Sequence, residues 1–105
     1  MWRAYIRNPR RVTNDPMEAT LIGFKMWAQA VTQARTTAVD PVRTALYGQK
    51  VAAPSGYEVE MHRNHHLSKP VMIGEVQADG QFNIVYRTPT AIPAENWSPF
   101  IPENA

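Results

Sequence analysis

Cysteine is absent from this sequence, which excludes a disulfide framework, a thiolate nucleophile and a cysteine-based metal site. Long apolar runs are absent too, because no stretch approaches the roughly 18 to 20 apolar residues that a membrane-spanning helix requires. The N-terminus lacks the apolar segment of a signal peptide, so we expect no export signal in this chain. With 105 residues, we treat the chain as a single segment, 1–105, of one small domain at most.

Motifs for catalysis are missing as well. With 5 glycines, the sequence has no phosphate-cradling loop of the kind that ATPases use. No serine lies in a nucleophile elbow, and Glu58 and Glu60 alternate on the polar face of a predicted strand instead of converging. His62, His65 and His66 have metal-ligand chemistry, but adjacent histidines on a strand point to opposite faces and no further ligand completes a site. The sequence therefore predicts no enzyme, no cofactor and no metal.

Positive charge is concentrated at the N-terminal end. Four arginines precede the first acidic residue: Arg3, Arg7, Arg10 and Arg11. A short helix over residues 2–7 would place Trp2, Tyr5 and Ile6 on one face and leave the arginines in water. Because no recognition motif or basic stripe extends this patch, we predict no nucleic-acid partner.

Two helices are predicted from their starts. Asp15 is expected to cap the first by accepting a backbone N–H, with Pro16 at the first helical position and Glu18 closing a capping box, so that this helix covers residues 16–35. Asp40 and Pro41 repeat the pattern for a shorter helix over 41–47.

The long helix has an unusually wide apolar face. One stripe is formed by Met17, Leu21, Phe24, Ala28 and Val31, and it is broadened by Ile22, Met26 and Ala30. This width predicts burial on two sides of the helix. Gly23 is expected to permit close packing against another element.

Strand signals follow the helices. Tyr57, Val59 and Met61 alternate with polar residues, which predicts a half-buried strand near 57–61. Asp79-Gly80 separates two apolar runs and predicts a β-hairpin over 71–87, because both residues tolerate a positive φ. Prolines then forbid a helix in the tail, 88–105, which we expect to be extended. Four apolar residues are expected to hold this tail: Ile92, Trp97, Phe100 and Ile101.

Several motifs together resemble one known family. They are Arg11-Val12-Thr13-Asn14-Asp15-Pro16-Met17-Glu18-Ala19-Thr20, Ala45-Leu46-Tyr47-Gly48-Gln49, Asn64-His65-His66-Leu67-Ser68-Lys69-Pro70-Val71 and Ile73-Gly74-Glu75-Val76-Gln77-Ala78-Asp79-Gly80-Gln81-Phe82. They resemble the C-terminal end of the urea and short-chain-amide binding proteins of ABC transporters, which are type I periplasmic binding proteins. The resemblance implies an α/β fold in which this chain is a C-terminal fragment, with two helices followed by a strand and a β-hairpin.

The resemblance also implies a function without catalysis. The full-length parent would be a periplasmic solute-binding subunit that binds urea or a short-chain amide and delivers it to the membrane permease of an ABC transporter. The start of the long helix would then approach the ligand cleft, which makes Asn14, Asp15, Met17 and Glu18 the candidate ligand-binding residues. The alternative for Asp15 and Glu18 is that they only cap the helix.

Other functions stay open at this point. An amide-sensing regulatory protein of the same fold carries a similar pattern, matched here by Leu46-Tyr47 and by residues 53–56. A stand-alone interaction module is a third class. As an isolated fragment, the chain would leave uncovered the apolar helix surface that a larger sheet normally covers, so we expect a homo-oligomer.

Overall fold

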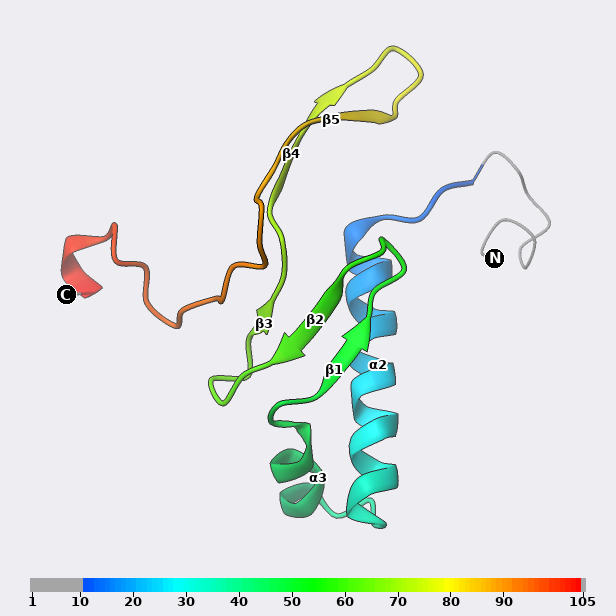
Figure 1. Ribbon diagram of the computed structural model, residues 1–105, viewed down its shortest axis with the longest axis vertical. Helices are drawn as coiled ribbons and strands as arrows, with labels where there is room; N and C mark the ends of the chain where they lie inside the picture. The colour runs from blue at the N-terminus through cyan, green and yellow to red at the C-terminus, as the bar shows by residue number, and fades with distance from the viewer. Residues whose placement is uncertain (1–10, 105) are drawn as a thin grey trace.

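The computed structural model describes residues 11–104, which form two helices and two small antiparallel sheets (Figure 1). The helix predicted over residues 2–7 lies outside this range. Helix α2 (Asp15–Ala34) is followed by the shorter helix α3 (Val39–Leu46), which packs against it. Both helices begin and end within two residues of the predicted limits. The cap predicted at Asp40 is wrong, because α3 begins before it and its N-cap, Ala38, makes no side-chain hydrogen bond.

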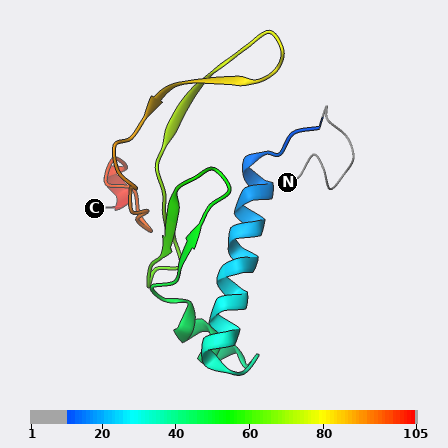
Figure 2. The same ribbon diagram turned by 45° about the vertical axis from the view of Figure 1, so that its right-hand side comes forward.

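A three-stranded sheet lies alongside α2 in both views (Figures 1 and 2). It consists of β1 (Lys50–Ala52), β2 (Glu58–Met61) and β3 (Leu67–Ser68), in the order β1-β2-β3, with antiparallel pairing. The predicted strand near 57–61 is therefore the central strand of this sheet. Its two neighbours were not predicted from the sequence.

The core lies between α2 and this sheet. Its buried members are Ile22, Met26, Val51, Ala53 and Val59. The buried face of α2 is thus the one carrying Ile22, Met26 and Ala30. Leu21, Phe24 and Trp27 remain exposed, so the prediction of burial on two sides is wrong for the chain as described. Gly23 likewise has open space where a side chain would lie, and the packing role predicted for it is not observed.

The second sheet is the predicted hairpin, formed by β4 (Met72–Val76) and β5 (Phe82–Arg87). Its turn includes Gly80 at φ +79°, and it extends beyond the three-stranded sheet (Figures 1 and 2). The ring of Phe82 lies across the backbone of Gly74, where the Cβ of any larger residue would meet the ring at 3.1 Å. A glycine at position 74 therefore lets the ring settle on the opposite strand.

The tail follows an extended course that differs from the prediction in two ways. The backbones of Lys69 and Ile92 exchange two hydrogen bonds, of 3.3 and 3.0 Å, and the Asn64 side chain donates to the Ala94 carbonyl at 2.9 Å. The apolar side chains expected to hold the tail are exposed, Phe100 to 92%. Backbone pairing fastens the tail instead, and a 3₁₀ turn, η1 (Pro102–Asn104), lies close to its end. Within residues 11–104, neither helix is long and apolar enough to span a bilayer.

Candidate functional site

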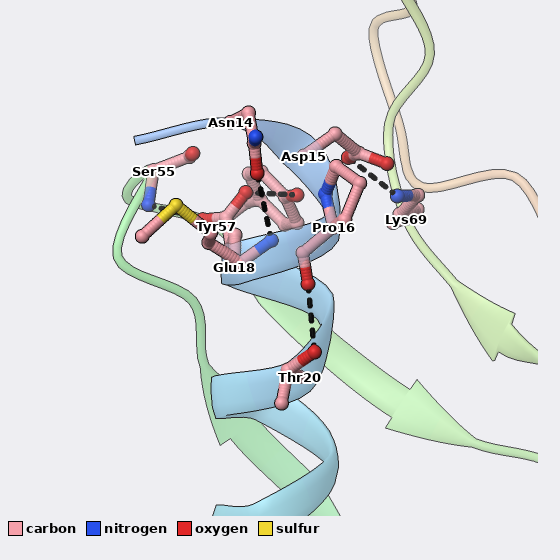
Figure 3. Close-up of polar contacts among 9 residues, drawn as sticks. Asn14, Asp15, Pro16, Glu18, Thr20, Ser55, Tyr57 and Lys69 are labelled. Atoms are coloured by element: carbon pink, nitrogen blue, oxygen red, sulfur yellow. Dashed lines mark hydrogen bonds and ion pairs between the residues drawn. The ribbon is translucent and has the colours of Figure 1, made fainter. Parts of the chain in front are cut away.

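The candidate site lies at the start of α2, where polar groups from three parts of the chain meet (Figure 3). Asn14 is the N-cap: its backbone is extended, and its Oδ1 accepts from the Met17 N–H at 3.0 Å. Asp15 is already helical, and Pro16 follows it in the first turn. The assignment of the cap to Asp15 is therefore wrong by one residue, because Asn and Asp are equally good caps and proline fits either of the first helical positions.

The corrected cap leads to a stability prediction. Replacing Asn14 by alanine should lower the free energy of unfolding by about 0.5 to 2 kcal/mol, because the Met17 N–H loses its acceptor. Replacing Asp15 by alanine should cost less, since its exposed carboxylate acts on the helix only through its charge. Denaturation of the two variants in guanidinium chloride measures the difference. A larger loss in D15A than in N14A would return the capping role to Asp15.

Asp15 is turned toward the segment that follows β3. Its Oδ1 lies 3.3 Å from the Lys69 Nζ, and the aspartate side chain is 75% exposed. An exposed ion pair of this kind contributes at most about 1 kcal/mol. The second carboxylate oxygen of Asp15 and the amide nitrogen of Asn14 have no hydrogen-bond partner among residues 11–104. One acceptor and one donor thus lie on neighbouring residues with access to solvent.

Glu18 has a different environment from the one predicted. Its side chain does not close a capping box; it accepts from the Ser55 N–H at 2.7 Å and from the Tyr57 hydroxyl at 3.3 Å. Burial, followed by the nearby Glu18 carboxylate, raises the pKa of the Tyr57 phenol above its usual value. Tyr57 therefore keeps its proton and remains a donor to Glu18 throughout the neutral range.

Met17 is half-buried beside these groups and offers an apolar contact. The four predicted site residues, Asn14, Asp15, Met17 and Glu18, therefore lie in one helical turn, but they differ in what they leave accessible. Three residues that the sequence did not indicate join them: Ser55, Tyr57 and Lys69. They come from the β1–β2 turn and from the end of β3, and no spacing signal in the sequence connects them to α2.

The histidines lie elsewhere, in the turn between β2 and β3. His62 hydrogen-bonds Ser68, His65 Nε2 lies 3.2 Å from the Tyr47 hydroxyl, and His66 Nδ1 lies 2.9 Å from a backbone carbonyl. His65 adopts a positive φ of 64°, which belongs to a turn and not to a strand. Within the described part of the chain, no three His, Cys, Asp or Glu residues are grouped so as to hold a metal ion.

The groups at the start of α2 therefore form a solvent-accessible polar surface of hydrogen-bonding groups on an α/β framework. A family model described as "Periplasmic binding protein domain" matches residues 1–103. The chain therefore belongs to the periplasmic binding protein family, and its two helices and two sheets are consistent with part of such a domain.

A comparison with curated proteins adds one relative. The protein "Limonene hydroxylase" of Geobacillus stearothermophilus is 36% identical over 84 residues, which cover 80% of this chain and 15% of that protein. The chain thus spans about 15% of the length of the curated relative it matches.

Proposed function

We propose that this chain forms part of the solute-binding subunit of an ABC transporter and contributes to the binding of urea or a short-chain amide, without catalysis. The observation that carries the proposal is the match of a periplasmic binding domain to residues 1–103. Proteins with such domains bind small solutes. A periplasmic location and delivery to a membrane permease are part of the same proposal.

The chemistry at the start of α2 supports an amide as the solute. An amide presents a carbonyl acceptor and N–H donors side by side. The Asn14 amide nitrogen, which has no partner within residues 11–104, is a donor for the carbonyl, and the second Asp15 oxygen is an acceptor for an N–H. We propose these two groups as ligand contacts, with Met17 and Glu18 completing the surface from the same helical turn.

The name of the relative points to a different chemistry. Limonene is a hydrocarbon, and its recognition would depend on apolar side chains. The groups that meet at the start of α2 are instead a carboxylate pair, an amide, a hydroxyl and an ammonium. This composition favours a polar solute over a terpene.

The test is a calorimetric titration, with urea and with acetamide, of a binding domain in which this chain supplies the C-terminal part. We expect one saturable site, and D15A should weaken binding by more than tenfold, about 1.4 kcal/mol, with only a small shift of the melting temperature. Asp40 is a matched control, because it is also exposed in the first turn of a helix, where it pairs with Arg43 at 3.1 Å. D40A should bind as the unmodified domain does.

Two results would contradict this proposal. If the affinity of D15A is within twofold of that of the unmodified domain, Asp15 does not contact the solute and contributes only to the first turn of α2. Failure of both solutes to bind would show that the solute belongs to another chemical class.

A further inference from the structure

The side chain of Glu18 joins two parts of the chain that are distant in sequence. Oε1 accepts from the Ser55 N–H at 2.7 Å and Oε2 from the Tyr57 hydroxyl at 3.3 Å, at separations of 37 and 39 residues (Figure 3). Both carboxylate oxygens are thus engaged within the chain. The first turn of α2 is connected in this way to the turn between β1 and β2.

The β1–β2 turn offers its donor through its own backbone geometry. The Ala53 N–H donates to the Tyr57 carbonyl at 2.7 Å, and the Gly56 N–H donates to the Ala53 carbonyl at 2.9 Å. Gly56 has a φ of +89°, which residues with a side chain rarely adopt. These internal bonds leave the Ser55 N–H for a partner outside the turn, and Glu18 is that partner.

Within the part of the chain that the structure describes, the partners of the Glu18 carboxylate are hydrogen-bond donors without a positive charge. Among residues 11–104, no lysine, arginine or histidine lies within ion-pair distance of its carboxylate. Its position in the first turn of α2 is favourable for a negative charge because of the helix dipole. A hydrogen bond from a backbone N–H to a carboxylate is about twice as strong as one between neutral groups. The Tyr57 ring is packed against the core, so this donor is held in place from its other side.

We propose that Glu18 is a positioning residue, which ties the β1–β2 turn to the start of α2 and fixes the arrangement of Asn14 and Asp15 beside it. The ligand role of those two neighbours rests on the proposed function, whereas the bridge itself does not. Each carboxylate oxygen of Glu18 accepts one hydrogen bond within the chain, and in this proposal Glu18 acts on a ligand mainly through the position of its neighbours.

The experiment is backbone amide hydrogen exchange, followed by NMR, on the full 105-residue chain without solute. In E18A, exchange of the Ser55 amide should accelerate at least about tenfold relative to that of Val59, because only the former loses its acceptor. E18Q should restore part of the protection, with an acceleration of about threefold, since its carboxamide oxygen still accepts. The Met17 and Asn14 amide resonances should shift in E18A, which reports the change in the cap.

The matched control is E58A, which removes the same charge from the exposed side of β2, where Glu58 faces Lys50 at 3.8 Å. It should leave the Ser55 exchange and the Asn14 and Met17 resonances unchanged. Unaltered Ser55 exchange in E18A would overturn the proposal, and so would an acceleration shared equally by Val59. Should E18A fail to fold, E18M takes its place, because methionine keeps the length of the side chain but offers no carboxylate acceptor; unchanged protection at Ser55 in that variant contradicts the bridge.

The outcomes are separable from those of the proposed function. The exchange measurements contain no solute, so a failure to bind urea or acetamide does not affect them. An unprotected Ser55 amide in a domain that still binds an amide would remove the bridge and leave the proposed function intact.

Discussion

Replacing Met26 by alanine is expected to lower the free energy of unfolding by about 2 to 5 kcal/mol. Met26 is completely buried between α2 and the three-stranded sheet, where it contributes to the cluster that contains Val51 and Val59. Its truncation removes transfer free energy and leaves a cavity that the short strands cannot close fully. Denaturation in guanidinium chloride, followed by circular dichroism, measures the loss.

Phe24 provides the matched control on the same helix. It is 63% exposed on the opposite face, so F24A should cost less than about 1 kcal/mol. Similar losses in M26A and F24A would show that the outer face of α2 is covered in solution. That result would support the self-association proposed from the sequence, because a second copy would then supply the cover.

Replacing Gln49 by alanine should lower the free energy of unfolding by about 1 to 3 kcal/mol, because it removes the buried centre of a network of amide side chains. Gln49 is only 6% exposed. Its amide nitrogen donates to Gln33 Oε1 at 2.7 Å and to the Ala45 carbonyl at 2.8 Å, and its oxygen accepts from Gln29 Nε2 at 2.8 Å. The side chain therefore joins α2, α3 and the start of β1.

Gln33 is the natural comparison, because it is an exposed outer member of the same network. Q33A should cost less than Q49A, since water can replace an exposed partner but not a buried one. A double-mutant cycle with Q33A and Q49A isolates the coupling between the two amides. A coupling of zero would mean that Gln49 contributes through packing alone.

Short sequence motifs predicted those helices and strands whose formation depends on only a few neighbouring residues. The start of α2 and the β4–β5 hairpin were both expected, because a proline next to a capping residue and an Asp-Gly turn act over a few residues. Strands β1 and β3 have three and two residues, which is too short for an alternation to stand out in the sequence. They exist through pairing with β2, which no local pattern reveals.

The candidate site follows the same division. Asn14 and Asp15 were indicated by the helix start, and the structure changes only which of them is the cap. The capping box predicted for Glu18 is a local motif, whereas its observed partners are distant in sequence. The Glu18 carboxylate could accept either from the helix start or from a distant segment, and the folded chain places Ser55 and Tyr57 within its reach. The spacing of residues in the sequence does not distinguish these two alternatives.

The contact between Gly74 and Phe82 has a consequence for how this hairpin can change its sequence. An alanine at position 74 would place its Cβ 3.1 Å from Phe82 Cδ1 and 3.2 Å from Phe82 Cβ. Rotation of the ring relieves the first contact but not the second, because Cβ is fixed by the backbone of β5. Positions 74 and 82 are therefore coupled. A variant that enlarges residue 74 and keeps Phe82 must also move strands β4 and β5 apart. Among sequences that keep Phe82 and fold into this hairpin, most should therefore keep glycine at position 74.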